Sequence, residues 1–527
     1  MTQKVLLIRP WMIVSPRMSA YFTVIPPLGI GYVAAALEQA GREVRLLDIA
    51  AEGWSTLLPS SVHPDLSDEG MPEEAVVEIF NDFRPDLIGI SNSSTPQFPS
   101  ALRVARLAKR VLPKVPVVMG GVHPSSVPQE AISEEAVDFV VRGEGEIPAV
   151  ELCEALGGTR PLSEVGSLLW KANGKVCSNP LARAFELTSL VPAYHLLPME
   201  RYFEAAALDT TVRGGHGRRW APILTSRGCP YRCNFCSVHL LEGRKWRGRP
   251  PQHIVAEMEQ LHENYGISVF TIEDSNFTFD IKRAVQICEL IAQRLPEATF
   301  SLPNGIRADR IPQELVDALA RANCSEVTVA IEHGDQEFLD SVIKKRLKLK
   351  GVVESVRRVR RKGIPVSGFF ILGIPPETKQ TLWATWKMAL KLAKIGMLPQ
   401  LNIAMPMPGT EMYEHALTNG FIAHPLQATD YLVIAEMRPL IDGPTLSGHS
   451  LLRAKTGIYL TALITAFVFN PKYFFTFPFI RSTLRDFSSF RTFKRRLRKI
   501  LGLLGFSRAS LERRAEATPE KSDKAAT

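Results

Sequence analysis

Three cysteines within a span of eight residues carry the clearest chemistry in the sequence. Cys229, Cys233 and Cys236 lie in the stretch RGCPYRCNFCSVH, with the spacing C-x3-C-x2-C. Thiolates are the usual ligands of iron–sulfur clusters, and this spacing lets one loop wrap around such a cluster. Because a cubane contains four irons, three ligands leave one iron open to a substrate or cofactor. The sequence therefore predicts a redox-active cluster with one exchangeable position.

A structural zinc site is the alternative use of the same cysteines. Such a site normally closes with a fourth Cys or His ligand. The residues that could supply this ligand are Cys288, Cys324 and His239. Both of these further cysteines lie in apolar periodic runs, where buried thiols are common, so the cluster is the favoured interpretation.

The stretch around and after the cysteines resembles the radical SAM superfamily. The resemblance rests on the cysteine spacing, on Phe235 just before the third cysteine, and on motifs that occur in the family's order between Leu224 and Glu414: GRKWRGRPPQHIVAEMEQL, FTIEDSNFTFD, NGIRADR, VAIEHGDQEFLD, FFILGIPPET and AMPMPGTEMYE. It implies a [4Fe-4S] cluster whose open iron is chelated by the amino and carboxylate groups of S-adenosylmethionine (SAM). One electron then cleaves the sulfonium to a 5′-deoxyadenosyl radical.

The same resemblance implies SAM contacts at the expected strand ends. Carboxylates can accept from the methionine ammonium or the ribose, an arginine can pair with the methionine carboxylate, and glycines let a strand approach the adenine. The candidates are Phe235, Glu273, Asp274, Asn304, Arg307, Glu332, Gly368 and Gly373. For each acid, an ordinary rim residue or a helix cap is the alternative. His333 and Pro376 depart from the family pattern, which often has Ser and Gly at these places.

Alternating strands and helices must position these residues. From Ile223 about six strand–helix units follow one another, which predicts a (β/α)6-type partial TIM barrel with its chemistry at the strand C-termini. Residues 1–150 also alternate short apolar strands with helices, the pattern of a doubly wound, Rossmann-like parallel sheet covered on both faces. The predicted fold class is therefore α/β, with a helical C-terminal extension.

Small residues follow three strands of this first domain, where a large ligand would dock. The motifs GGVHP and RGEGE, with PPLGIGYVAAAL near the start, resemble the cobalamin-binding domain of B12-dependent radical SAM enzymes. The candidate cobalamin contacts are Ser91, Ser93, Ser94, Gly120, Gly121, His123, Gly143 and Glu144. His123 alternatively caps its loop, and the whole domain alternatively is an empty fold that binds substrate or a partner. No D-x-H-x-x-G motif follows the first strand, so no axial cobalt ligand is assigned.

Composition limits the remaining possibilities. The chain has 527 residues, is 45% hydrophobic and carries a net charge of +9, with much of the excess between Arg481 and Arg514. Seven cysteines make no disulfide framework and indicate a reducing compartment. The N-terminus, MTQKVLLIRP, predicts a strand rather than a signal peptide, and no uninterrupted run of about 18 apolar residues predicts a membrane span. A cytoplasmic location follows, with membrane association through the tail as an addition.

The predicted domain boundaries follow these changes in pattern. They are 1–150 for the cobalamin-binding domain, 151–220 for a linker with a strand pair turning at Asn173–Gly174, 221–415 for the radical SAM barrel, 416–510 for a basic and aromatic helical domain, and 511–527 for a disordered tail. The basic and aromatic tail suits a membrane surface or a lipid-like substrate, and equally an ordinary helical cap over the barrel. No nucleic-acid-binding module accompanies its charge, so nucleic acid is not an expected partner.

These features together predict an enzyme, a cobalamin-dependent radical SAM methyltransferase. The resemblance implies that one SAM gives the radical that activates an unactivated carbon of a small-molecule or lipid-like intermediate, and that another methylates cob(I)alamin. A flavodoxin- or ferredoxin-type protein would donate the electron. The alternatives are a cobalamin-dependent radical cyclase or ring-rearrangement enzyme, and a non-catalytic cobalamin sensor. A methylthiotransferase is disfavoured, because only Cys153 and Cys177 precede Cys229.

Overall fold

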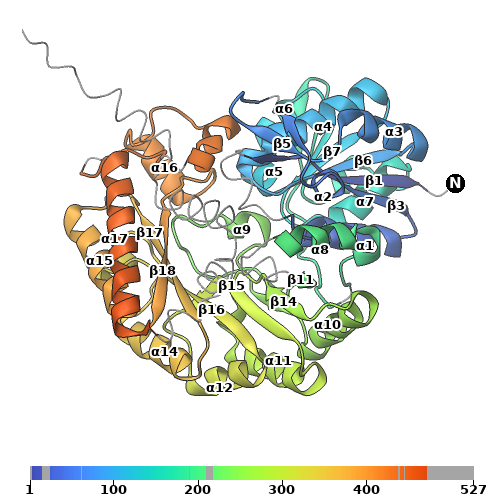
Figure 1. Cartoon of the computed structure of the whole chain (residues 1–527). Coiled ribbons are helices and arrows are strands. Elements are labelled where there is room, and N and C mark those ends of the chain that lie inside the picture. Colours follow the sequence, from blue (N-terminus) through green and yellow to red (C-terminus); the bar gives the residue numbers. More distant parts are fainter. Residues whose placement is uncertain are drawn as a thin grey trace, which may run out of the picture.

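Two sheets, each wrapped by helices, organise the chain (Figure 1). The computed structural model describes residues 3–471 apart from 15–23, 61, 189, 209–217, 437–438 and 444. The predicted disordered tail, 511–527, and all of the basic residues between Arg481 and Arg514 lie outside the described residues. The first sheet belongs to the N-terminal part of the chain and the second to the middle, and they meet along one side.

The first sheet is the predicted doubly wound one. Its seven strands have the order β10-β9-β8-β7-β6-β1-β3, and β1 (Lys4–Arg9), β3 (Glu43–Asp48), β6 (Leu87–Asn92), β7 (Val117–Gly121) and β8 (Phe139–Val141) run parallel. Alternate side chains of β1 point to opposite faces. One face is covered by α1 (Leu28–Gln39) and α7 (Glu146–Leu156), and the other by α3 (Glu73–Phe83) and α4 (Phe98–Val111).

The segment predicted as a linker adds to this sheet. The expected strand pair is present as β9 (Leu168–Ala172) and β10 (Lys175–Ser178). The turn between them has φ of 50° at Asn173 and 74° at Gly174, the left-handed backbone that a tight hairpin of this kind requires. Because β9 pairs antiparallel with β8, the hairpin extends the edge of the first sheet. The helix α8 (Met199–Leu208) also joins this layer, since the Tyr202 hydroxyl donates to Asp48 at 2.6 Å.

The stretch between β3 and β6 contains regular structure that the sequence did not predict. A small antiparallel sheet forms from β2 (Met12–Val14), β5 (Ser67–Glu69) and β4 (Leu57–Pro59), with the short helix α2 (Ile49–Glu52) before it. These strands are three residues each. Such short strands leave little periodicity for a sequence to display, which explains why the pattern did not reveal them.

The second sheet is the predicted partial barrel. Its six strands are parallel and keep their chain order: β11 (Trp220–Ile223), β14 (Val269–Ile272), β15 (Thr299–Arg307), β16 (Cys324–Glu332), β17 (Val366–Leu372) and β18 (Met397–Ile403). The helices between them are α10 (Pro251–Tyr265), α11 (Ile281–Arg294), α12 (Gln313–Arg321), α13 (Gln336–Ser341), α14 (Leu349–Arg361) and α15 (Lys379–Ala393). β11 and β18 remain unpaired with each other, so the barrel is open.

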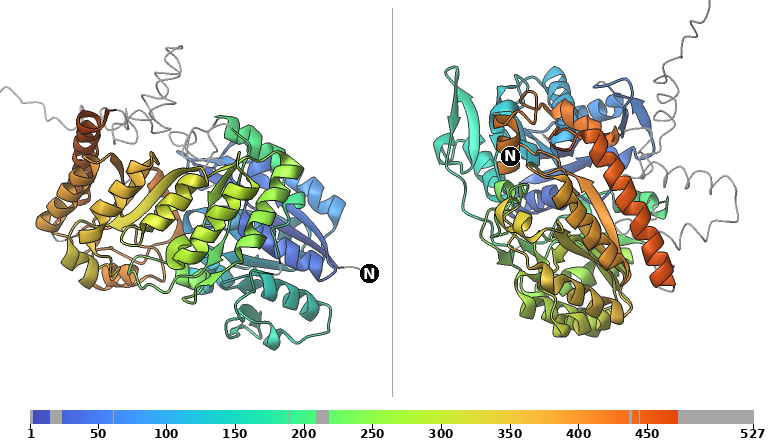
Figure 2. Two further views of the ribbon diagram at one scale, coloured as in Figure 1. Left: turned by 90° about the horizontal axis from the view of Figure 1, so that it is seen from below. Right: turned by 90° about the vertical axis from the view of Figure 1, so that its left-hand side faces the viewer.

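Helices follow the barrel at its last strand. After α16 (Glu411–Thr418) and a 3-10 helix at Ala428–Glu436, the long helix α17 (Gly448–Phe469) lies beside α15 and β18 on the outside of the molecule (Figure 2). By length and composition α17 is long and apolar enough to cross a membrane, and 22% of its most apolar stretch of 18 residues is buried in the protein. α17 lies within the region predicted as helical, 416–510, where the sequence predicted no membrane span because polar residues interrupt the apolar run.

Candidate functional site

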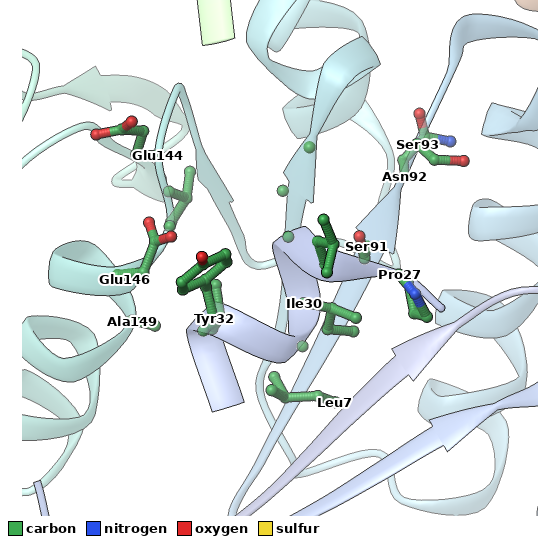
Figure 3. A pocket seen from close by; sticks show the side chains of 18 of the residues that line it. Leu7, Pro27, Ile30, Tyr32, Ser91, Asn92, Ser93, Glu144, Glu146 and Ala149 are labelled. Carbon is green, nitrogen blue, oxygen red and sulfur yellow. The ribbon is translucent and has the colours of Figure 1, made fainter. Parts of the chain in front are cut away.

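A cavity of about 420 Å³ lies at the C-terminal ends of the first sheet's strands. Its wall contains the residues that follow β6, β7 and β8, and it extends down the sheet face that α1 and α7 cover. Figure 3 shows Glu144, Glu146 and Tyr32 on one side of it and Ser91, Asn92 and Ser93 on the other. The barrel closes the cavity with Pro222, Leu224, Arg227, Leu241, Glu242 and Glu273. The site therefore belongs to both domains.

Glycines shape the rim of this cavity. Gly121 has φ of 105°, and a Cβ there would lie 2.2 Å from the Asn92 carbonyl oxygen, so only glycine fits. Gly143 has φ of 74°, and its N–H donates to the Ser125 hydroxyl at 2.9 Å. A Cβ at Gly120 would touch nothing closer than 3.8 Å, so this glycine leaves open space in the cavity wall. The strand ends thus offer a backbone surface that a planar group can approach.

Six of the eight predicted cobalamin contacts line this cavity, namely Ser91, Ser93, Gly120, Gly121, Gly143 and Glu144. Ser94 does not, since it begins a 3-10 helix at Thr95–Gln97. His123 does not either, because its ring is 1% exposed, stacks on Phe98 at 4.1 Å and lies 3.5 Å from Glu130. The lining of the cavity therefore gives these two residues no support, and a cobalamin contact stays a prediction for them.

The polar and axial chemistry of the cavity fits cobalamin. Asn92 lines it, is 1% exposed, and has no protein partner for either side-chain atom. Such buried amide atoms require a partner, which the amides around a corrin ring can supply. None of the described cavity-lining residues is a His, Met or Cys.

The cysteine loop connects β12 (Ser226–Arg227) with α9 (Val238–Leu241). Gly228 enables the turn into it, with φ of 83° and with the Lys245 carbonyl oxygen 2.3 Å from where a Cβ would be. The Gly228 N–H donates to the Glu242 carboxylate at 2.8 Å. Farther along, the Asn234 N–H donates to the Ile343 carbonyl at 3.0 Å. These contacts hold the loop against the barrel mouth at both ends.

The surroundings of the cysteines suit a cluster rather than zinc. Burial raises the pKa of the Cys233 thiol to about 11 and also raises that of Cys236, so thiolates here need the positive charge of bound iron. Cys288 and Cys324 lie apart, buried in the barrel core.

Asp274 is an anchor for the loop and not a free ligand. It is 3% exposed and accepts from the Thr225 N–H at 2.6 Å, the Thr225 hydroxyl and the Ser226 hydroxyl, both at 2.5 Å. Burial raises the pKa of this carboxyl, against the effect of these hydrogen bonds. Its neighbour Glu273 points the other way along β14 and lines the cavity between the domains. The two adjacent acids thus have different surroundings.

Arg307 is also engaged within the chain. Its guanidinium donates to both oxygens of Asp309 at 3.2 and 3.0 Å and to the carbonyls of Lys345 and Arg346 at 3.0 and 3.1 Å. It lies 4.2 Å from the ring centroid of Tyr231, which belongs to the cysteine loop. The guanidinium is thus engaged within the chain, and its pairing with the methionine carboxylate stays a prediction. Asn304 lies on the same strand, β15.

Glu332 ends β16 with φ of 68° and pairs with a residue that the sequence did not reveal. Its carboxylate accepts from the Lys345 ammonium at 2.7 Å, with both side chains buried. Lys345 follows Ile343 by two residues, and the Ile343 carbonyl accepts from Asn234 between Cys233 and Cys236. The positive charge of Lys345 opposes the rise in the pKa of both thiols, so it lies on the side of the cluster site. Phe235 packs against the edge of the barrel core. A lysine in a polar run between two helices gives no sequence signal.

The two glycines predicted to face adenine meet the chain itself. A Cβ at Gly368 would lie 2.7 Å from the Met397 side chain, and one at Gly373 would lie 2.6 Å from Leu451 of α17. Tight packing therefore accounts for both. The unusual His333 is fully buried and pairs with Glu377 at 3.0 Å, so the departure from the family pattern is matched by an internal partner.

An ionic contact that the sequence did not predict joins the two domains. Arg227, next to the cysteine loop, donates to Glu146 at 2.7 Å and to Glu144 at 3.2 Å, and Arg247 donates to both oxygens of Glu144 at 2.6 and 3.1 Å. Burial opposes the charge of Arg227, but the two carboxylates outweigh it and raise its pKa. We call these four residues the interdomain clamp. The carboxylate oxygens of Glu144 thus accept hydrogen bonds from two arginines, and the residue lines the cavity as part of this clamp.

Comparisons with known proteins agree with this architecture. The B12 binding domain family matches residues 16–153, and the Radical SAM superfamily matches residues 223–389. Cytidylyl-2-hydroxyethylphosphonate methyltransferase of Streptomyces wedmorensis is 32% identical, covering 75% of this chain and 78% of that protein. The hopanoid C-3 methylase of Methylococcus capsulatus is 26% identical, covering 76% and 70%. The structure of the methyltransferase TsrM from Kitasatospora setae, with cobalamin and a [4Fe-4S] cluster bound, has a TM-score of 0.62 at 21% identity, covering 81% and 76%.

The chain belongs to the cobalamin-dependent radical SAM methyltransferases, the B12-binding branch of the radical SAM enzymes. It is accordingly an enzyme, and the non-catalytic sensor is excluded. Its cofactors are a [4Fe-4S] cluster, SAM and cobalamin. The cysteine loop, the apolar cavity and the orphaned Asn92 amide are the features of this structure that fit them.

Proposed function

We propose that the enzyme methylates an unactivated carbon of a small-molecule or lipid-like biosynthetic intermediate. The observation that carries this proposal is the cavity between the domains, which is lined both by the small residues after β6, β7 and β8 and by residues of the barrel next to the cysteine loop. A methyl donor and a radical source would then open on one space. When bound, the cluster and SAM supply the radical and cobalamin supplies the methyl group.

The chain's own residues hold and separate these groups. Cys229, Cys233 and Cys236 would bind the cluster, and Ser91, Ser93, Gly120, Gly121 and Gly143 with Asn92 would bind cobalamin. The apolar wall around Ile30 and Leu224 excludes water from the shared space. Glu273, which faces the same cavity, can orient a polar group near the cluster side.

For SAM we propose a different set of contacts from the strand-end pattern. Lys345 is the buried cation beside the cysteines, so it would pair with the methionine carboxylate, with Glu332 holding the ammonium of Lys345 in place. Phe235 and Asn304 remain proposed contacts from the family pattern. A flavodoxin- or ferredoxin-type protein in a reducing cytoplasm would supply the electron, and all seven cysteines are free of disulfides.

Relatives favour methyl transfer over other radical reactions. Two of the relatives already described are named as methyltransferase or methylase enzymes, and the hopanoid enzyme's name gives a carbon, C-3, as the position that it methylates. A radical cyclase is the second candidate. It is favoured by the anaerobic magnesium-protoporphyrin IX monomethyl ester cyclase of Rubrivivax gelatinosus, which is 26% identical, covering 69% of this chain and 62% of that protein.

An anaerobic assay distinguishes the two reactions. The reconstituted holoenzyme is incubated with reductant, SAM carrying a deuterated methyl group, and an organic extract of the producing cells. Methylation predicts 5′-deoxyadenosine, S-adenosylhomocysteine and a product that carries the deuterated methyl group. A product formed with 5′-deoxyadenosine but without S-adenosylhomocysteine would contradict methylation and favour the cyclase. The Cys229→Ala variant is the control and should form none of these products.

A further inference from the structure

The outer faces of α15 and α17 form a surface that the proposed reaction does not use. On α17, Leu460, Ile464 and Val468 are 37%, 62% and 62% exposed. They are spaced four residues apart, so they share one face of the helix. The opposite face, with Ile458, Ala462 and Ala466, is buried. α17 is therefore held to the protein by one side and presents an aliphatic stripe on the other.

A second stripe runs along the neighbouring helix. Trp383 is 52% exposed on α15, and the exposed lysines Lys387, Lys391 and Lys394 follow it at helical spacing. The helices contact each other in their middle and at their C-terminal ends, since Trp386 of α15 donates to Thr461 at 3.0 Å and the Lys394 ammonium lies 5.2 Å from the ring centroid of Phe469. No described carboxylate forms an ion pair with these three lysines. The aliphatic stripe thus lies beside an aromatic and cationic one.

The chain continues from this surface into its most basic segment. Residues 481–514 contain eleven Lys and Arg and two Asp and Glu, an excess equal to the net charge of the whole chain, +9. Aromatic residues come before it, in the sequence KYFFTFPFI. An aliphatic stripe, an exposed tryptophan, a row of lysines and a basic segment attached directly to them together match an anionic lipid surface.

We propose that the α15–α17 surface, defined by Leu460, Ile464, Val468, Trp383, Lys387 and Lys391, docks the enzyme on an anionic lipid bilayer. Charge decides against the other occupants. A second copy, or the basic segment folded back, would bring further positive charge onto the lysines of α15. Nucleic acid would match the lysines but not the aliphatic stripe. The contact is peripheral rather than spanning, because one face of α17 is buried against α15 and β18.

Sedimentation of the full-length holoenzyme with vesicles tests this proposal without using the reaction, so its outcome does not depend on the proposed function. Vesicles of phosphatidylcholine with roughly one-third phosphatidylglycerol should bind the enzyme at least about tenfold more tightly than pure phosphatidylcholine, since each lysine near an anionic surface adds measurably to binding. Failure to bind the anionic vesicles would overturn the proposal.

Two pairs of matched variants locate the contact. Ile464→Ser with Val468→Ser should weaken vesicle binding by about tenfold or more, whereas Val176→Ser with Leu181→Ser, also exposed apolar residues but on the first domain, should not. Lys387→Glu with Lys391→Glu should weaken it similarly, whereas Lys282→Glu with Lys350→Glu, on α11 and α14, should not.

The remaining outcomes are equally decisive. Unchanged binding of the Ile464 and Val468 variant would show that the basic segment binds without α17, and would overturn the proposed surface. Dimerisation that this variant abolishes, without vesicle binding by the parent, would assign the face to a second copy. Displacement of the vesicles by RNA of any sequence would assign the charge to nucleic acid. Thermal unfolding midpoints equal to that of the parent confirm that each variant is folded.

Discussion

The strand ends of the two sheets carry different kinds of residue and differ in what those residues contact. At the first sheet, Ser91, Gly120 and Gly143 face a cavity. At the second, Asp274 accepts from Thr225 and Ser226 just before the cysteine loop, and Arg307 donates to the Lys345 carbonyl and stacks on Tyr231 of the loop. Small residues leave space that a ligand can fill, whereas charged residues buried at a rim must be neutralised by their neighbours. The first set therefore shapes a ligand site, and the second holds the loop that carries the cluster.

The largest expected effect comes from breaking the interdomain clamp. Arg227→Met keeps the length of the side chain and leaves Glu146, which is 2% exposed, buried without its partner. Removing one member of a buried pair costs about 3–5 kcal/mol, measured as the free energy of unfolding of the anaerobic holoenzyme in urea. The control is Arg219→Met, whose partner Glu200 is exposed, and it should cost at most about 1 kcal/mol. Equal losses in both variants would contradict the clamp.

A buried acid inside the barrel gives the next effect. Glu326 accepts from the Ser367 hydroxyl at 3.0 Å, and burial raises its pKa to about 7. Because the folded pKa lies above the unfolded one, the stabilisation is complete below the unfolded pKa and is lost as the pH rises through about 7. Glu326→Gln should remove up to about 3 kcal/mol of this pH dependence between acidic and alkaline buffers. The free energy of unfolding of both proteins is measured at several values from about pH 5 to about pH 8, on either side of the range where an acid with this pKa titrates. Parallel profiles of the two proteins would contradict the raised pKa of Glu326.

A smaller effect distinguishes support of the loop from SAM binding. Arg307→Lys keeps the charge but loses the planar fork that reaches Asp309 and two carbonyls. We expect a loss of about 1–2 kcal/mol in stability and a change in SAM affinity below about threefold. Lys345→Met should instead weaken SAM binding by about tenfold or more, as the loss of a charged partner does. Isothermal titration with SAM measures both, and the reverse order would restore Arg307 as the carboxylate ligand.

The smallest effect is expected at His123. Its ring packs on Phe98 outside the cavity wall, so His123→Phe should change the affinity for cobalamin by less than about twofold. Absorbance titration of the apoprotein with hydroxocobalamin provides the measurement. A large loss of affinity with an unchanged unfolding midpoint would place His123 in the cobalamin site after all.

Much of the fold was predictable because its signals are local. Apolar runs of strand length and amphipathic helices alternate along both domains. The pair Asn173–Gly174 predicts the hairpin turn, which the structure contains. The cysteine loop was predictable because three of its ligands lie within one short stretch. The cavity was predictable at its glycines, because small residues follow the strands where a ligand would dock. The φ of 105° at Gly121 shows why a glycine is needed at that position.

The rest depended on contacts between residues far apart in the chain. Glu144 and Arg227 are separated by 83 positions, and Glu332 meets Lys345 only after α13 turns the chain back. The arginines of RGCP and RGRP and the acids of RGEGE were each visible, but nothing in the sequence shows which of them pair. Asn92 lies between Ser91 and Ser93, which the sequence analysis named as candidates. Only the burial of its amide without a partner indicates that Asn92 can bind a ligand.

One crossed measurement tests the central claim that two separate sets of residues hold two cofactors around one cavity. Iron and cobalamin are quantified in anaerobically reconstituted Cys229→Ala, Gly120→Leu and the control Gly351→Leu, where a side chain meets nothing within 4 Å. We predict that Cys229→Ala loses the cluster of about four irons and keeps cobalamin. Gly120→Leu should do the reverse, and Gly351→Leu should keep both. Full retention of cobalamin by Gly120→Leu would contradict the account.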